Sequence, residues 1–114
     1  MSIDRKLTAG STDMLLLKLL EHEDMYGYQI IEELRRRSNH VFDLKAGTLY
    51  PLLHQLTQKG YLTVWEQAAG EARVRKYYHL TKKGADYLAA REREWRDFAG
   101  AVRGVLGGDG CVLA

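Results

Sequence analysis

Between Lys45 and Gly60 the hydrophobic positions recur with the period of an α-helix. The leucines of this stretch fall at i, i+3, i+4 and i+7, a spacing that places them on one stripe; they are Leu49, Leu52, Leu53 and Leu56. The opposite face carries short side chains able to donate and accept hydrogen bonds: Thr48, His54, Gln55 and Gln58, with Tyr50 and Pro51 near the start. Gly60 follows as a C-terminal stop. The pattern predicts an amphipathic helix with one buried face and one hydrogen-bonding face.

Pro51 interrupts this helical pattern. It lacks a backbone N–H, and in a helix its ring crowds the carbonyl of Gly47. Two interpretations remain open from the sequence. Either the regular helix begins at Thr48, which places Pro51 in the first turn, or the helix is bent at Pro51.

Two shorter helical patterns precede the leucine stretch. The first follows N-cap candidates at residues 11–13 and ends near His22, and the second runs from about Tyr26 to Ser38. Their apolar faces consist of Leu15, Leu16, Leu19 and Leu20 in the first, and of Ile30, Ile31 and Leu34 in the second. The second ends in three arginines, Arg35–Arg37, at the helix end where the dipole favours cations. Such a run is typical of a solvated helix end.

After Gly60 the period changes from helical to alternating. Residues 61–67 are rich in β-branched and aromatic side chains, residues 68–72 form a turn, and residues 73–80 form a second strand. Thr81 then has the character of an N-cap, and a long helix extends to about Leu106. The sequence thus predicts a β-hairpin followed by a long helix.

The order of these elements predicts a mainly α protein with a small β-hairpin, in the α+β class. A helix-turn-helix followed by a hairpin is a winged helix, here with a long C-terminal helix. We expect a flexible arm at residues 1–10, a winged-helix domain at 11–80, the long C-terminal helix at 81–106 and a mobile tail at 107–114.

Composition narrows the class of protein without naming a partner. The chain has 114 residues, of which 46% are hydrophobic and 28% charged, as in a folded domain. The net charge of +2 is too small to indicate, by itself, that the protein binds nucleic acid. The single cysteine, Cys111, excludes an internal disulfide and fits the cytoplasm. No signal peptide is apparent, and the longest apolar run near the N-terminus, Met14–Leu17, is too short to cross a membrane.

The positions of the charges indicate more than their sum. The amphipathic helix alone is more typical of an ordinary surface helix, but its polar face is what reading base edges in a major groove requires. The hairpin beside it carries Arg73, Arg75 and Lys76, which can reach backbone phosphates. The residues expected to face bases are Tyr50, His54 and Gln55, and those expected to bind phosphate at the helix start are Lys45 and Thr48.

The long helix has a short heptad pattern. Leu88, Trp95 and Val102 recur every seven residues, and Phe98 and Val105 occupy the intermediate positions. Arg91 breaks the seam, and each of the glycines at 100 and 104 weakens the helix by about 1 kcal/mol relative to alanine. We therefore expect a dimer interface that needs a second element. The surplus leucines of the first helix, Leu16 and Leu20, are the predicted second half.

Several motifs together resemble the PadR family of bacterial transcriptional regulators. They are Gly47-Thr48-Leu49-Tyr50-Pro51, Arg75-Lys76-Tyr77-Tyr78, Leu80-Thr81, Gly84, and the second-helix opening Tyr26-Gly27-Tyr28-Gln29-Ile30. The resemblance covers roughly residues 7–106. One departure is visible: where the family often has two adjacent arginines before Lys-Tyr-Tyr, Val74 replaces the first. The length of the tail resembles that of the compact subfamily without a large C-terminal domain.

The resemblance implies a homodimeric repressor, released by a small-molecule signal, that binds a DNA operator of dyad symmetry. It implies that the third helix enters the major groove, that the wing contacts the DNA backbone, and that Tyr28 belongs to the DNA-binding surface. Trp95 has two interpretations. It is either a packing residue at the dimer interface, or, as in multidrug-binding members, the lining of a pore where planar aromatic effectors stack.

Three other classes of protein would be alternatives to a transcriptional regulator. An enzyme lacks support because there is no phosphate-binding glycine loop, no paired histidines at helical spacing and no cysteine near a histidine. A metal sensor lacks a ligand cluster, and no cofactor is expected. A winged helix used for protein–protein contacts remains, and salt-dependent binding to duplex DNA would distinguish it from a regulator.

Overall fold

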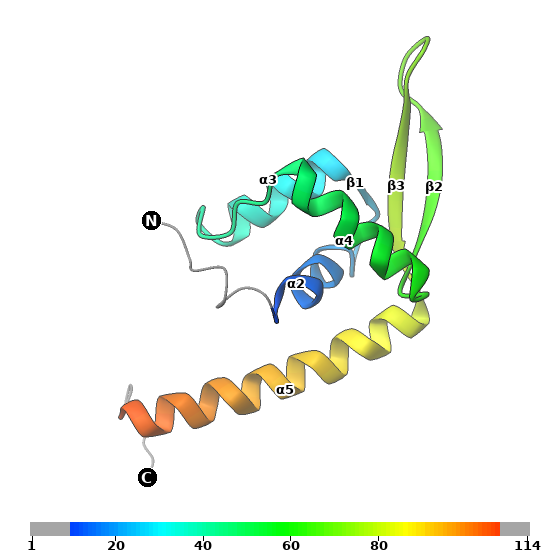
Figure 1. Ribbon diagram of the computed structural model, residues 1–114. Helices are drawn as coiled ribbons and strands as arrows, with labels where there is room; N and C mark the ends of the chain where they lie inside the picture. The colour runs from blue at the N-terminus through cyan, green and yellow to red at the C-terminus, as the bar shows by residue number, and fades with distance from the viewer. Residues whose placement is uncertain (1–9, 108–114) are drawn as a thin grey trace.

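A computed structural model of the chain describes residues 10–107. Along this part of the chain the elements are helix α2 (Thr12–Leu19), strand β1 (Met25–Tyr26), helices α3 (Gly27–Arg37) and α4 (Ala46–Gln58), strands β2 (Leu62–Ala68) and β3 (Val74–Leu80), and helix α5 (Lys82–Leu106). Figure 1 shows the three shorter helices gathered together, with the β2–β3 hairpin projecting from one side and α5 running beneath them. The predicted arm up to residue 9, and the predicted tail from residue 108 with Cys111, lie outside the described residues.

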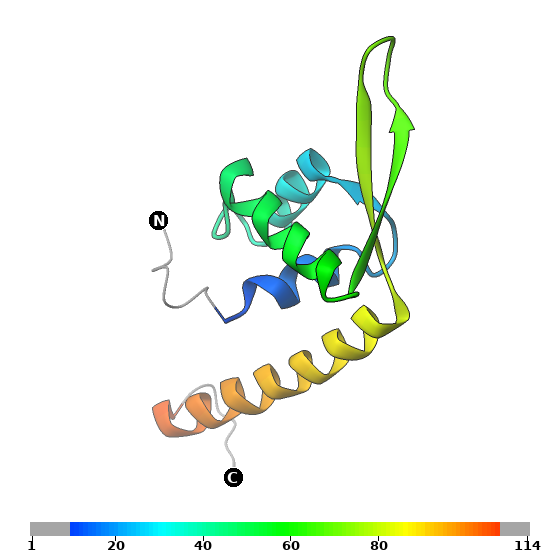
Figure 2. The same cartoon turned by 45° about the vertical axis from the view of Figure 1, so that its right-hand side comes forward.

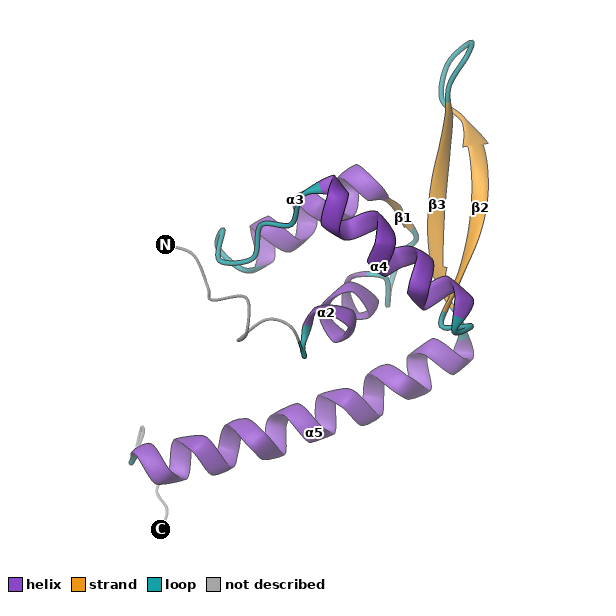
Figure 3. Cartoon of the chain, viewed as in Figure 1, coloured by secondary structure: helices purple, strands orange, loops and turns teal. Residues whose placement is uncertain are grey.

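The winged helix-turn-helix is confirmed, with a long C-terminal helix following it (Figure 3). Its core is made by one side of each helix, because burying their apolar stripes together is the main driving force for folding. Fully buried side chains include Leu16, Leu17, Ile30, Leu49, Leu53, Leu62 and Leu88. The four leucines of α4 face this core as predicted, with Leu52 only partly covered. The first helix ends at Leu19, earlier than the predicted His22.

The sheet has a strand that the sequence did not reveal. Its order is β1-β3-β2, with β1 antiparallel to β3 through the pairs Met25–Tyr78 and Tyr26–Tyr77. The prediction of a two-stranded hairpin was incomplete here because a strand of two residues has no alternation to detect. Met25 is buried, so this short strand joins the loop before α3 to the base of the wing. We use "wing" below for β2, β3 and their turn.

The bounds of helix α4 contradict the first of the two interpretations of Pro51. The helix begins at Ala46, two residues before Thr48, and Pro51 lies inside it. Since proline has no N–H, the Gly47 carbonyl loses its usual intrahelical donor. At the other end Gly60 has φ of +84°, the left-handed conformation expected of the predicted helix stop.

Helix α5 begins and ends as predicted. The Thr81 side chain accepts a hydrogen bond from the Gly84 N–H at 3.0 Å and donates one to the Gly60 carbonyl at 2.7 Å. A single threonine thus caps α5 and ties it to the end of α4, at the corner from which the wing and α5 diverge (Figure 2). The helix ends at Gly107, a C-cap with φ of +71°.

The structure corrects three of the predicted dimer contacts. Leu16, Leu20 and Leu88 are 0%, 2% and 1% exposed within the single chain, so they have no surface to offer a partner. The reason is the position of α2, which packs against α3 on one side and α5 on another. Its surplus leucines serve two contacts within the protomer rather than one between protomers.

Candidate nucleic-acid interface

Helix α4 presents the polar face that the sequence predicted. Thr48, Tyr50, His54 and Gln55 are all exposed, while Leu49 and Leu53 on the opposite side are fully buried. The helix is therefore held by one face, and the other is free to enter a groove. Tyr28, at the start of α3, is also exposed, at 63%.

The start of α4 is suited to an anion. Lys45 is its N-cap, makes no side-chain cap hydrogen bond, and has an 80% exposed side chain. The first turn contains no acidic residue. Because the first N–H groups of a helix lack intrahelical acceptors and carry the positive end of the dipole, this end favours a phosphate.

Tyr50 contributes to packing as well as to the exposed face. A Cβ built on Gly27, the first residue of α3, would collide with the Tyr50 hydroxyl and ring. The absence of a side chain at Gly27 therefore lets Tyr50 lie across the start of α3. This contact sets the approach of α4 to α3, a function of Tyr50 that the sequence pattern did not indicate.

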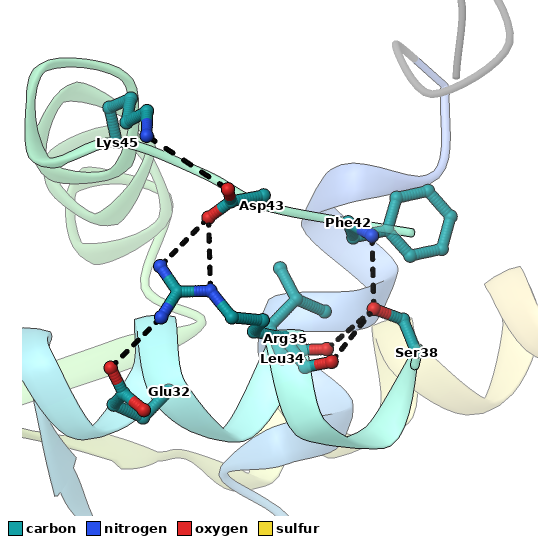
Figure 4. A network of polar contacts seen from close by, with 7 residues as sticks. All are labelled: Glu32, Leu34, Arg35, Ser38, Phe42, Asp43 and Lys45. Atoms are coloured by element: carbon teal, nitrogen blue, oxygen red, sulfur yellow. Dashed lines mark hydrogen bonds and ion pairs between the residues drawn. The ribbon is translucent and has the colours of Figure 1, made fainter. Parts of the chain in front are cut away.

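The loop between α3 and α4 is held by side chains at both ends (Figure 4). Ser38 Oγ donates to the Leu34 carbonyl at 2.8 Å and accepts from the Phe42 N–H at 2.9 Å. Nearer to α4, the Arg35 guanidinium donates from Nε and Nη2 to one oxygen of Asp43, at 3.2 and 2.9 Å. The third donor of Arg35, Nη1, contacts Glu32 at 3.1 Å.

These contacts divide the arginine run of α3 into two groups. Arg36 and Arg37 pair with Glu33 on their own helix, at 2.6 and 2.8 Å, and the hydrogen bonds from Arg36 and Arg37 lower the pKa of Glu33 to about 2. Arg35 instead reaches across the loop to Asp43, and the hydrogen bond from Arg35 lowers the pKa of Asp43. The prediction of a solvated helix end describes Arg36 and Arg37 but misses Arg35, whose partner is eight residues away in sequence.

The wing carries its cations on both faces. Arg75 and Lys76 are neighbours in β3, so their side chains point to opposite faces. The Arg75 guanidinium lies 4.4 Å from the centre of the Tyr26 ring, while Lys76 is paired in register with Glu66. Arg73 precedes β3, which starts one residue later than predicted, and its carbonyl accepts from the Ala69 N–H across the turn. All three cations are exposed.

A cluster at the base of the wing was missed by sequence reasoning. Asp24, in the loop before β1, accepts a hydrogen bond from the Trp65 indole N–H at 2.8 Å and contacts His79 Nδ1 at 2.8 Å. Trp65 stacks on Tyr77 with 4.4 Å between ring centres, and Tyr77 meets Tyr26 edge-on. These residues come from the loop before β1, from β1 itself, and from β2 and β3, so no local pattern could have joined them.

The structure brings α4 and the wing together around one groove of about 490 Å³. His54 and Thr57 line it from α4, and Trp65, Glu66 and Lys76 line it from the wing. The predicted base-facing residue His54 and the predicted phosphate-binding residue Lys76 therefore border a shared space. Gln55 and Thr48 are exposed on α4 but do not line this groove.

Helix α5 exposes an apolar stripe. We call Trp95, Phe98, Val102 and Val105 the α5 stripe; they are 48%, 67%, 39% and 88% exposed. Beside it, a groove of about 440 Å³ separates α5 from α2, with Met14, Leu15, Phe42 and Trp95 on its walls. The remaining predicted dimer residues are thus accessible, unlike the three buried leucines.

Residues 10–107 offer neither a metal site nor a membrane-spanning helix. No three histidine, cysteine, aspartate or glutamate side chains of this region are arranged to hold a metal ion. None of the helices described is both long and apolar enough to cross a membrane.

Comparison with known proteins identifies the family. Residues 16–90 match the family described as the transcriptional regulator PadR-like family. The chain is 36% identical over 95 residues to transcriptional regulator Rv3488 of Mycobacterium tuberculosis, covering 81% of this chain and 82% of that protein.

Solved structures give the same result. A PadR family transcriptional regulator from Eggerthella lenta superimposes with a TM-score of 0.79 at 30% identity, over 91% of this chain and 88% of that one. PadR of Bacillus subtilis, solved in complex with operator DNA, superimposes with a TM-score of 0.65 at 26% identity, over 69% of this chain and 45% of that one. The chain therefore belongs to the PadR-like family of transcriptional regulators, and not to a family of enzymes.

Proposed function

We propose that the chain binds duplex DNA sequence-specifically as a homodimer, with α4 in the major groove and the wing on the backbone. The observation that carries the proposal is the division of α4 into a buried leucine face and an exposed polar face, bordered by an uncapped helix start and by the cations of the wing. The similar PadR of Bacillus subtilis binds operator DNA, which supports this assignment.

The homodimer is supported by the α5 stripe. An apolar stripe of this kind on the end of a single helix is unusual for a monomer, and its heptad spacing fits the same stripe of a second copy. Two linked copies would place two α4 helices against a dyad-symmetric operator. We further propose that the dimer is a repressor and that a small molecule releases it.

The experiment is a footprint on the DNA upstream of the chain's own gene, followed by affinity measurements on the protected site and on mixed-sequence DNA. His54→Ala and Gln55→Ala should each cost about 1–3 kcal/mol on the protected site and much less on mixed-sequence DNA. His22→Ala is the matched control, because His22 is an exposed histidine that lies outside α4 and the wing. Equal losses of affinity on both DNAs would show that these residues of α4 do not read the base sequence.

A second candidate function, binding of planar aromatic compounds, is favoured by the groove beside Trp95. If Trp95 is only a packing residue of the dimer, Trp95→Ala should weaken the dimer and with it DNA affinity. If Trp95 stacks on a ligand, the dimer should survive and binding of planar dyes should be lost, since an aromatic partner contributes about 0.5–1.5 kcal/mol beyond area burial.

The measurement is dye quenching of tryptophan emission in the parent and in Trp95→Ala, with oligomeric state measured on the same samples. Trp65 remains in the variant as an internal control. Equal quenching of both proteins would exclude ligand stacking on Trp95.

A further inference from the structure

Asp43 is an acidic side chain in an unfavourable place for a DNA-binding surface. It precedes the N-cap of α4 by two residues, and its Oδ2 forms a long ion pair with Lys45 Nζ, at 3.9 Å (Figure 4). A free carboxylate at this position would attract Lys45 away from a phosphate and would repel the phosphate itself. Either effect would weaken binding at the start of α4.

Arg35 opposes both effects. Two of its guanidinium nitrogens bind the other oxygen of Asp43, Oδ1, and the third binds Glu32 (Figure 4). Because each of its three guanidinium nitrogens already donates a hydrogen bond inside the protein and its side chain is only 29% exposed, Arg35 is poorly placed to contact DNA directly. Its position instead neutralises Asp43 and fixes the loop that leads into α4.

The Arg35–Asp43 contact also helps to fix the conformation of the loop between α3 and α4. Asn39 and His40 both have left-handed backbone conformations, with φ of +56° and +68°, a region that side chains other than glycine adopt at a cost. Ser38 holds the first half of the loop through Phe42, and Arg35 holds the second half through Asp43. The direction in which α4 starts therefore depends on the Arg35–Asp43 contact.

We propose that Arg35 is a positioning residue for DNA binding: by binding Oδ1 of Asp43, it weakens the long Asp43–Lys45 ion pair, so that Lys45 and the start of α4 can bind a backbone phosphate. This inference rests on the proposed function, since it assumes that the start of α4 binds DNA. On this inference Arg35 changes the affinity for DNA through its contact with Asp43, without touching the DNA itself.

The test is a cycle of four proteins: the parent, Arg35→Gln, Asp43→Asn, and the double variant. The probe is a labelled mixed-sequence duplex of about 30 base pairs, titrated between about 50 and 200 mM KCl. Arg35→Gln should weaken binding and reduce the magnitude of the slope of log K against log[salt] by about one, because one phosphate contact is lost. We compare the gain in affinity that Asp43→Asn gives in two backgrounds. This gain should be at least about threefold larger in Arg35→Gln than in the parent, because members of one ion-pair network are coupled and their effects do not add.

The chain supplies a charge-matched control. Arg36→Gln removes the same charge from the neighbouring position, but Arg36 pairs with Glu33 and has no contact with Asp43. We expect Arg36→Gln to reduce affinity less, and Asp43→Asn to have the same effect in its background as in the parent. If Arg35→Gln does not fold, Arg35→Lys serves: it keeps the charge but loses the two-pronged contact, so it should still weaken binding.

Two results would overturn the inference. One is additivity of Arg35→Gln and Asp43→Asn, and the other is an Arg35 variant that binds like the Arg36 variant. Failure of the proposed function looks different, because the parent itself would then show no salt-dependent binding to the duplex. Thermal unfolding of all variants, followed by circular dichroism, separates loss of fold from loss of binding.

Discussion

The indole N–H of Trp65, on β2, donates a 2.8 Å hydrogen bond to the carboxylate of Asp24, which lies in the loop before β1. The same carboxylate contacts His79 on β3 through its other oxygen, at 2.8 Å. One side chain therefore ties both strands of the wing to the helical part of the molecule. The angle of the wing to α4 depends on this tie as well as on the sheet.

Asp24→Ala is accordingly expected to loosen the wing. Loss of the acceptor leaves Trp65 and His79 to bind water instead, because both are exposed, and we expect a cost of about 0.5–1.5 kcal/mol in the free energy of unfolding. The emission of Trp65 should change as the ring becomes more solvated. The measurements are urea unfolding and tryptophan emission, both in a Trp95→Phe background so that Trp65 alone reports.

Asp24→Asn is the matched variant, because an amide oxygen can still accept from the indole N–H. It should retain most of the Trp65 signal. If Asp24→Ala leaves both the emission and the unfolding curve unchanged, Asp24 does not hold the wing.

The wing is expected to bind DNA through phosphates rather than bases. Arg75→Ala should weaken binding to all duplexes alike and reduce the magnitude of the salt slope by about one. Lys82→Ala is the control, because Lys82 is 88% exposed at the start of α5, beyond the end of the wing. A slope unchanged by Arg75→Ala would remove this residue from the interface.

Gly84 is predicted to tolerate no larger residue. A Cβ at this position would collide with the Tyr61 carbonyl, a backbone atom, and with Leu80. Because the Thr81 cap holds α5 against the same corner, the helix cannot move away without breaking it. Gly84→Ala should therefore lower the free energy of unfolding by about 1–3 kcal/mol, the usual cost of an overpacked contact.

Gly100→Ala is the control, and it should have the opposite sign. No atom lies near the position of its Cβ, and alanine favours a helix interior over glycine by about 1 kcal/mol. Equal effects of the two substitutions on urea unfolding would contradict the proposed contact at Gly84.

Tyr87 links α5 to α2 by a hydrogen bond. From this contact we predict that the stability of the fold depends on pH in the alkaline range. Its hydroxyl donates to Asp13 at 2.6 Å, and burial, followed by that hydrogen bond, raises its pKa from 10.0 to about 12. A folded-state pKa above the unfolded value means that the neutral phenol is stabilised by folding. That contribution is complete below pH 10 and is lost as the pH rises through 12.

Tyr87→Phe should therefore be less stable than the parent below pH 10, and the difference should shrink as the pH rises from 10 through about 12. The comparison of parent and variant is essential, because burial also raises the pKa of Tyr78. The measurement is urea unfolding at a series of pH values, with tyrosinate absorbance recorded alongside. A difference that stays constant with pH would show that the Tyr87 hydroxyl is not bound to Asp13.

The sequence alone determined every helix and strand of the described residues except β1, and most of their boundaries. Helical spacing of four leucines identified α4, alternation identified the wing, and Thr81 marked the start of α5, because these signals come from residues close together in the chain. Motifs of the same local kind carry the resemblance to the PadR family. The spacing of polar residues along α4 likewise led to the proposal that its polar face reads DNA.

Tertiary structure decided every relation between distant residues. Leu16 and Leu88 became core rather than interface because α2 lies between other helices. Asp24 met Trp65, and Arg35 met Asp43, through folding of loops whose sequences have no periodicity. A period in the sequence says which face of an element is apolar. What covers that face, and which polar groups meet across a loop, depends on the packing of the whole chain.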